Sequence, residues 1–70
     1  MNWFTQHRLE WIAETLRVFG YINREHLMRK FGISKPQARN DLRTFARIAP
    51  SAMTYDTVAK RYVANNPPEK

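Results

Sequence analysis

The most constraining feature of this sequence lies between Phe31 and Gln37, where a helix stop is followed almost at once by a helix start. Gly32 is placed to end one helix, because glycine readily adopts the left-handed conformation found after a last helical turn. Ser34 opens the next helix, with Gln37 three residues on in the spacing of a capping box. Pro36 falls in the first turn, where its missing N–H costs nothing. This segment therefore predicts two helices joined by a very short turn.

Apolar residues repeat at helical spacing on both sides of this turn. The earlier helix follows Asn23, a residue type that caps helix N-termini, and covers residues 24–31. The later helix starts at Ser34 and ends before Pro50, whose ring cannot continue a helix. The inner faces are expected to be Leu27, Met28 and Phe31 on the first helix and Ala38, Leu42, Phe45, Ala46 and Ala49 on the second.

Further elements flank this pair of helices. Residues 5–19 have apolar positions at spacings of three and four, and Gly20 is placed to end the helix that they predict. Its expected buried face is Leu9, Ile12, Leu16 and Phe19. Residues 53–56 and 61–64 favour strands around a short turn, and residues 21–22 could add a very short third strand. This order predicts a mainly α domain with a small β-hairpin wing, a winged helix-turn-helix.

The chain has the size of one folded domain, which we place at residues 1–64. The Asn-Asn-Pro-Pro run within residues 65–70 is typical of a flexible tail or linker. Without cysteine, neither disulfides nor thiolate zinc sites can reinforce so short a chain, so a compact core or dimerisation must help. No stretch approaches the roughly 18 apolar residues of a membrane span, and we expect a soluble, cytoplasmic protein with no membrane contact.

Positive charge is concentrated in the middle third of the chain. Twelve Lys and Arg residues against six Asp and Glu give a net charge of +6. Residues 24–47 hold seven of the cations and two of the acids, whereas residues 1–23 are neutral and residues 48–70 carry +1. Such a concentration favours a polyanionic partner, and nucleic acid is the first candidate.

The helix after Ser34 carries four cations at intervals of four residues, Lys35, Arg39, Arg43 and Arg47. This spacing places them in one row along the helix, which we call the cationic ridge. A solvated helix face normally mixes acids with bases, but Asp41 is the sole acid between residues 34 and 49 and lies off the ridge. The pattern therefore favours contact with phosphates and bases over a merely solvated face.

In a helix-turn-helix, the start of the second helix reaches base edges and flanking groups hold phosphates. The expected base contacts are Gln37, Arg39, Asn40 and Arg43. The expected phosphate contacts are Ser34, Lys35 and Arg47, with Lys60 and Arg61 at the hairpin tip. Gln and Asn can pair bidentately with adenine, and Arg with guanine. Tyr55 and Tyr62 are spaced to face each other across the hairpin, and at least one is expected to pack on the core.

The first helix carries a second apolar stripe, Phe4, Trp11 and Val18, spaced by seven residues. We interpret this stripe as a dimer interface, because small domains need extra burial and tryptophan is enriched at interfaces. The alternative is that Trp11 packs under the wing or against the chain's own N-terminus, near Trp3.

Four segments together resemble the N-terminal winged helix-turn-helix domain of WYL-domain transcriptional regulators: residues 31–38 (FGISKPQA), 41–42 (DL), 55–56 (YD) and 59–63 (AKRYV). The phage-defence-associated repressors are the nearest branch, and DeoR-type winged helices are more distant. The resemblance covers roughly residues 8–64 and implies a dimer that binds inverted repeats. No WYL domain follows the wing in this sequence, so two alternatives stay open: a stand-alone regulator of the kind encoded by a phage or mobile element, or the DNA-binding part of a longer protein.

The leading hypothesis is a sequence-specific double-stranded DNA-binding repressor that acts as a dimer on an inverted-repeat operator. The alternative is a phage- or mobile-element-encoded protein-interaction module that inhibits a host defence complex. An enzyme is not expected, because His7 and His26 are the only histidines and lie on different elements. Solvent-facing or capping roles suit both, and neither a metal nor a cofactor is expected.

Overall fold

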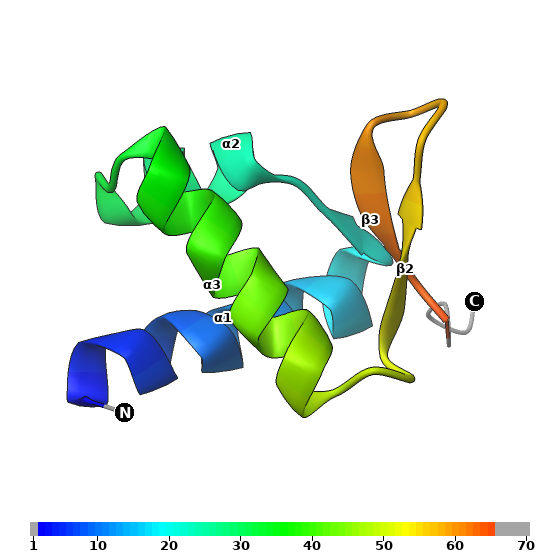
Figure 1. The fold of residues 1–70 in the computed structure, drawn as a ribbon. Coiled ribbons are helices and arrows are strands. Elements are labelled where there is room, and N and C mark those ends of the chain that lie inside the picture. Colours follow the sequence, from blue (N-terminus) through cyan, green and yellow to red (C-terminus); the bar gives the residue numbers. More distant parts are fainter. Residues whose placement is uncertain (1, 66–70) are drawn as a thin grey trace.

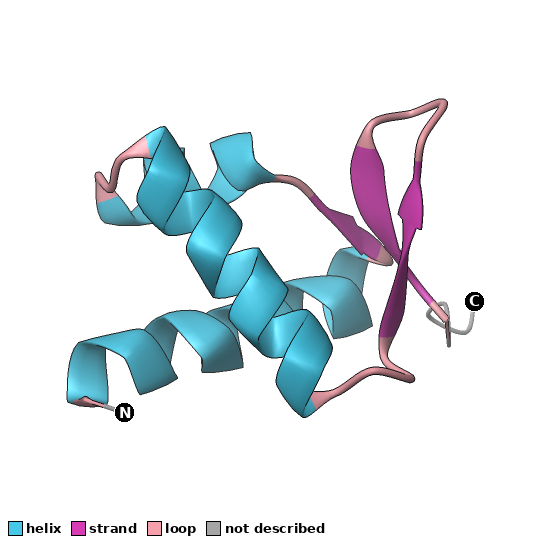
Figure 2. Cartoon of the chain, in the orientation of Figure 1, coloured by secondary structure: helices cyan, strands magenta, loops and turns pink. Residues whose placement is uncertain are grey.

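The computed structural model describes residues 2–65 and contains three helices and one three-stranded sheet (Figures 1 and 2). In chain order the elements are α1 (Trp3–Phe19), β1 (Tyr21–Ile22), α2 (Arg24–Phe31), α3 (Lys35–Ile48), β2 (Met53–Asp56) and β3 (Arg61–Ala64). The strands are antiparallel in the order β1-β3-β2. Helix α3 crosses in front of α1, and the β2–β3 hairpin stands beside it (Figure 1). The predicted winged helix-turn-helix is confirmed.

Helix α1 begins two residues earlier than the sequence pattern indicated. The Asn2 side chain caps it by accepting a hydrogen bond from the backbone N–H of Thr5 at 2.8 Å. At the other end Gly20 has φ +84°, the left-handed conformation that favours glycine, and its N–H donates to the carbonyl of Leu16. The predicted stop at Gly20 is therefore confirmed.

The turn between α2 and α3 has the predicted ends. Gly32 adopts φ +64°, and its N–H donates to the carbonyl of Met28 at 2.8 Å. The Ser34 hydroxyl accepts from the backbone N–H of Gln37 at 3.3 Å. Only this half of the predicted capping box is observed, because the Gln37 side chain bonds Asp41 instead of returning to the start of the helix.

A reciprocal capping box closes the start of α2. The backbone N–H of His26 donates to Oδ1 of Asn23, and the backbone N–H of Asn23 donates to Nδ1 of His26. The first bond is 3.1 Å long and the second is 3.2 Å. The expected capping role of His26 is confirmed, whereas His7 lies exposed on α1 and stacks on Trp3.

The core gathers the inner faces of all three helices and the sheet. Its buried members are Leu9, Ile12, Leu16, Ile22, Leu27, Ala38, Leu42, Phe45, Met53 and Ala64. The expectation that Phe19 is buried is wrong, since its side chain is 67% exposed. Phe19 is the last residue of α1, and Gly20 turns the chain into β1 before any element can cover it. Thr15 is buried one turn earlier, and its hydroxyl donates to the carbonyl of Trp11.

The hairpin has the predicted strands and the predicted tyrosine pair. Tyr55 and Tyr62 are partners in the β2–β3 register, with ring centroids 4.9 Å apart. Tyr62 packs partly buried against the core, whereas Tyr55 is 45% exposed. At the tip, Oδ1 of Asp56 accepts from the N–H groups of Val58 and Ala59, which shapes the turn.

The described chain ends on Asn65, which is bonded into the fold. Its backbone N–H donates to the carbonyl of Ala52, and its side-chain amide donates to the carbonyl of Ser51. Asn65 therefore lies with the folded unit, while the rest of the expected tail, residues 66–70, falls outside the described residues. None of the helices within residues 2–65 is long and apolar enough to cross a membrane.

Candidate nucleic-acid interface

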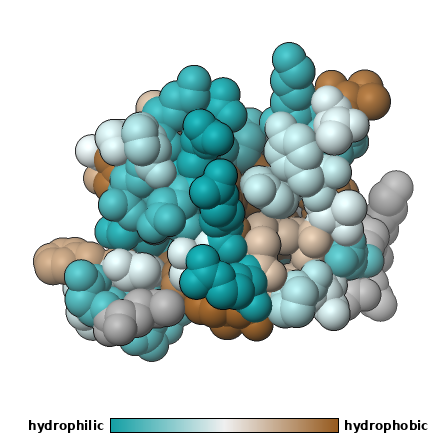
Figure 3. All heavy atoms as spheres, viewed as in Figure 1, coloured by the Kyte–Doolittle hydropathy of each residue, from teal (hydrophilic) through white to brown (hydrophobic). Residues whose placement is uncertain are grey.

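The cationic ridge forms the outer face of α3. Lys35, Arg39, Arg43 and Arg47 are all exposed, as is Asn40 beside them. In the space-filling view, hydrophilic side chains form a band along α3 (Figure 3). The inner side of the same helix buries Ala38, Leu42 and Phe45.

No acid within residues 2–65 pairs with the ridge. The ion pairs among the described residues join Arg8 to Asp41, Arg17 to Glu14 and Arg24 to Glu25. Asp41, the acid on α3, is 1% exposed and faces α1, where it accepts from Arg8. The ridge therefore presents uncompensated positive charge to solvent, which is the electrostatic footprint of a phosphate-binding surface.

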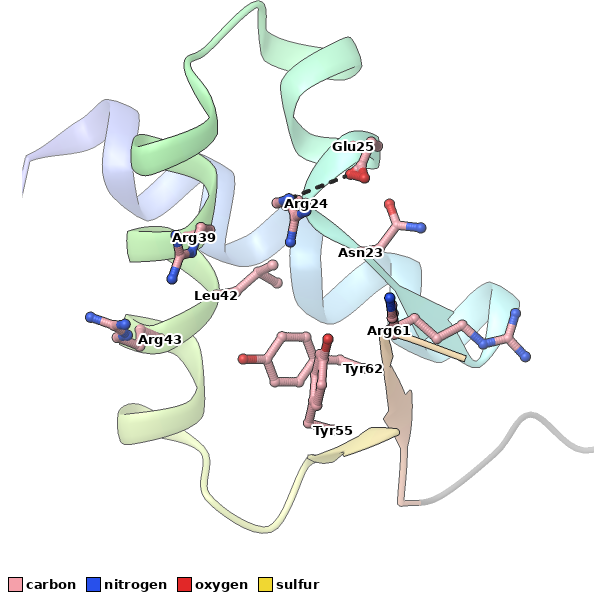
Figure 4. Close-up of a pocket in the computed structure, with 10 residues that line it drawn as sticks. Asn23, Arg24, Glu25, Arg39, Leu42, Arg43, Tyr55, Arg61 and Tyr62 are labelled. Atoms are coloured by element: carbon pink, nitrogen blue, oxygen red, sulfur yellow. Dashed lines mark ion pairs between the residues drawn. The ribbon is translucent and has the colours of Figure 1, made fainter. Parts of the chain in front are cut away.

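A cleft of about 360 Å³ lies between α3, the start of α2 and the wing (Figure 4). Its lining is rich in cations and also contains two tyrosines: Asn23, Arg24, Glu25, Arg39, Leu42, Arg43, Tyr55, Lys60, Arg61 and Tyr62. Arg39 and Arg43 thus belong both to the ridge and to this cleft. Cationic and hydroxyl groups on opposite walls can hold a phosphate chain from both sides.

The wing places its two expected phosphate contacts differently. Lys60 is exposed at the turn and has φ +56°. Arg61 is the first residue of β3, and its guanidinium carbon lies 4.2 Å from the centroid of the Tyr21 ring. Figure 4 shows this guanidinium directed away from Arg39 and Arg43. Arg61 pairs with Asp56 in the register position next to the turn, so Lys60 and Arg61 both lie at the hairpin tip as expected. Their side chains nevertheless differ, because the Arg61 guanidinium stacks on Tyr21.

Gln37 also differs from its neighbours on α3. Its side chain is half-buried, and its amide nitrogen donates to Oδ1 of Asp41 at 2.9 Å. Asn40 is exposed and is one residue from Asp41 in the chain. Of the two amide side chains near the start of α3, Asn40 is therefore the more exposed to solvent.

Arg24 was not singled out from the sequence, yet the structure brings it to the cleft. It is the first residue of α2, half-buried, with its guanidinium 3.7 Å from a Glu25 carboxylate oxygen. Its position directly after the cap residue Asn23 could have identified it, since the N-terminus of a helix favours anions. The cleft therefore gains a cation from α2 in addition to those of α3 and the wing.

The expected dimer stripe on α1 is only partly free. Phe4 is 67% exposed and Val18 is 48% exposed. Trp11 is half-buried and packs edge-on against Phe31 of α2, with ring centroids 5.5 Å apart. Trp3, which is 68% exposed and in contact with Phe4, extends the apolar surface toward the start of the helix.

Two comparisons with known proteins agree with this geometry. The family model described as the BrxR transcriptional regulator winged helix-turn-helix domain matches residues 5–67. A protein of Pseudomonas aeruginosa named DNA-binding transcriptional repressor CapW is 47% identical over 63 residues, which is 90% of this chain and 21% of the relative. Proteins with the same name are 43% identical in Escherichia coli strain KTE188 and 39% identical in Stenotrophomonas maltophilia.

These matches cover 87% and 91% of this chain, and 20% and 21% of the E. coli and S. maltophilia relatives. The chain thus spans about a fifth of the length of the curated relatives that it matches. The resemblance to the winged helix of WYL-domain repressors is confirmed. The family model covers nearly the whole described fold, from α1 to β3. The chain belongs to the family of BrxR transcriptional regulator winged helix-turn-helix domains.

Proposed function

We propose that this domain binds double-stranded DNA in a sequence-specific manner and acts in transcriptional repression. The observation that carries the proposal is the row of four exposed cations on α3 that no acid within residues 2–65 neutralises. Helix α3 is the second helix of the helix-turn-helix, which is the element that enters a major groove. The name of the CapW relatives, DNA-binding transcriptional repressor, supports the same function.

The proposed base contacts are Arg39, Asn40, Arg43 and, at the edge of the row, Gln37. Ser34 and Lys35 at the start of α3 would hold one phosphate and Arg47 another. The cleft would hold a strand of the backbone between α3 and the wing, with Arg24 and Lys60 as its cations. We assign Arg61 mainly to the wing itself, because its guanidinium stacks on Tyr21.

We further propose that two copies of the chain form a dimer through the exposed apolar part of α1, and that this dimer binds an inverted repeat. Phe4 and Val18 supply apolar surface that the chain itself leaves open, and Trp3 adds to it. A symmetric helix-turn-helix dimer places its recognition helices about 34–36 Å apart, or a multiple of that distance. The domain would act on DNA in the bacterial cytoplasm as a binding protein and not as an enzyme.

A protein-interaction module is the second candidate, and a groove beside α1 favours it. The groove has a volume of about 470 Å³. It is lined by Trp11, Thr15, Phe19, Tyr21, His26, Arg29 and Lys30, which makes it apolar with a basic edge. A protein partner that fills this groove could act with DNA binding or in place of it.

A fluorescence titration separates these two functions. The chain is titrated against duplex DNA from upstream of its own gene and against scrambled duplex of equal length, at two salt concentrations. Operator binding predicts selectivity of roughly a thousandfold or more together with steep salt dependence. Equal, weak and salt-sensitive binding to both duplexes would contradict sequence-specific recognition and favour the protein partner.

A further inference from the structure

We propose that Asp41 is a positioning residue for base recognition, because it fixes the orientation of the Gln37 side-chain amide. This inference rests on the proposed DNA binding. The Asp41 carboxylate is 1% exposed, between α3 and α1. It accepts from Nε of Arg8 at 2.6 Å, from Nη2 of Arg8 at 3.3 Å and from Nε2 of Gln37 at 2.9 Å.

The chemistry of this cluster allows one orientation of the Gln37 amide. An ionised carboxylate only accepts hydrogen bonds, so the amide group that faces Asp41 must be the NH₂ and not the carbonyl. The carboxylate is held in turn, because Arg8 contacts both of its oxygens and also lies 3.4 Å from the Thr5 hydroxyl. Turning the amide over would place two acceptors against each other in a buried site, which is costly.

A fixed amide reads fewer bases than a free one. A free glutamine can present either its carbonyl oxygen or its NH₂ to a base edge. Among the described residues Gln37 donates one Nε2 hydrogen to Asp41, which fixes the direction of Oε1 and leaves Oε1 open. In the major groove, the groups that donate to such an oxygen are the exocyclic amino groups of adenine and cytosine. We therefore infer that the Gln37 oxygen, whose direction Asp41 fixes, requires an amino group at the base that it contacts.

Asp41→Asn is expected to reverse this requirement. Its side-chain amide has one accepting oxygen and one donating nitrogen, and the Arg8 guanidinium can only donate. The oxygen of the introduced amide would therefore face Arg8 and its nitrogen would face Gln37. Gln37 would turn over to accept that bond and would present its own NH₂ to the DNA, which favours base acceptors such as N7 and O6 of guanine or O4 of thymine.

The test begins with selection from a library of random-sequence duplexes. The unsubstituted chain and Gln37→Ala are selected in parallel, and the base pair at which only Gln37→Ala loses its preference is taken as the Gln37 contact. Glu14→Gln is the matched control for Asp41→Asn. Both variants convert a carboxylate paired with an arginine into an amide, but Glu14 lies at an exposed site on α1. We expect Glu14→Gln to select the same motif as the unsubstituted chain.

Duplexes with single groups deleted at that base pair then decide the orientation. Deleting the exocyclic amino group, by purine for adenine or 2-pyrimidinone for cytosine, should weaken binding of the unsubstituted chain at least about fivefold. Replacing N7 of the purine by carbon should weaken it less. Asp41→Asn, if circular dichroism shows that it is folded, should reverse the order of these two losses. The comparison of the two deletions in the unsubstituted chain remains decisive if Asp41→Asn does not fold.

The outcomes separate this inference from the function on which it rests. A library without any enriched motif contradicts sequence-specific binding, and the inference falls with it. An enriched motif in which Gln37→Ala relaxes no base pair, or in which the N7 replacement costs more than the amino deletion, contradicts the inference alone. A folded Asp41→Asn that binds all duplexes uniformly more weakly, with the same base preference, would reduce Asp41 to a structural role.

Discussion

Helices α1 and α3 cross each other and bury their inner faces in one core, but their outer faces differ in chemistry. The outer face of α1 exposes Trp3, Phe4 and Val18, and its basic residue Arg17 is paired with Glu14. The outer face of α3 exposes the four cations of the ridge, and the acid on that helix is turned inward. Burial in the core therefore determines only the inner face of a helix. The outer face indicates the partner, which we propose is DNA for α3 and protein for α1.

The two helices are joined by one buried ion pair, and breaking it should have the largest effect on stability. Arg8→Met leaves the Asp41 carboxylate buried without its cation, which we expect to lower the free energy of unfolding by about 3–5 kcal/mol. Urea denaturation measures this loss. Arg17→Met is the control, because it breaks an exposed pair on the same helix and should cost less than about 1 kcal/mol. Equal losses in the two variants would show that burial of the pair contributes nothing.

Removing charge from the ridge tests the cationic face. Arg39→Ala together with Arg43→Ala should weaken binding to a selected duplex by about 2–4 kcal/mol and make its salt dependence less steep. The matched control removes Arg29 and Lys30, two exposed cations of α2 that line the groove beside α1. We expect this control to bind nearly as well as the unsubstituted chain. The same loss in both double variants would mean that total charge, and not the ridge, determines binding.

Two aromatic substitutions on α1 test the apolar face. Trp11→Ala removes a half-buried side chain that packs on Phe31 and should lower the free energy of unfolding by about 2 kcal/mol. Phe4→Ala removes an exposed ring and should change it by less than about 0.5 kcal/mol, while weakening self-association. Thermal unfolding and sedimentation velocity measure the two effects. A Phe4→Ala protein that is strongly destabilised but associates normally would assign that ring to the fold and not to a partner.

The smallest expected effect is at the wing tip. Lys60 has φ +56°, a conformation that glycine adopts without steric cost, so Lys60→Gly should raise the free energy of unfolding by about 0.5–1 kcal/mol. The same change should weaken DNA binding about threefold, because a phosphate contact is lost. Lys60→Ala removes the charge but keeps the strained backbone, so it should weaken binding equally without the gain in stability. Unchanged DNA affinity in both variants would show that the wing tip does not contact DNA.

Much of the fold could be predicted from the sequence because its helix ends are encoded locally. Gly20, Asn23, Gly32 and Ser34 act on residues within four positions of themselves, and each occupies its predicted cap in the structure. The burial of Phe19 could not be judged in the same way. The apolar spacing that predicts its burial is local, whereas its exposure depends on where α1 ends relative to β1.

The candidate site was less predictable, because its decisive contacts join distant parts of the chain. Arg8 and Asp41 are 33 positions apart, and both have the character of ordinary surface charges in the sequence. Their contact nevertheless turns Asp41 inward, and Asp41 in turn holds the Gln37 side-chain amide. The sequence pattern groups Gln37 with side chains that are free to contact bases. Arg61 likewise lies next to the turn as expected, but its guanidinium stacks on Tyr21 of the edge strand β1, a contact that the sequence pattern does not indicate. The cations of the ridge could be predicted as one face, since all of them lie on a single helix.

The contrast between the two faces can be tested most directly by NMR titration of the ¹⁵N-labelled chain with a duplex that carries one selected half-site. One half-site binds a single chain, so contact between two copies does not contribute. We expect amide shift changes along α3, at Arg24 and at the wing tip, while the indole N–H signals of Trp3 and Trp11 stay unchanged. Shift changes that gather on α1 and the groove beside it, with α3 unaffected, would contradict the assignment of DNA to the cationic ridge.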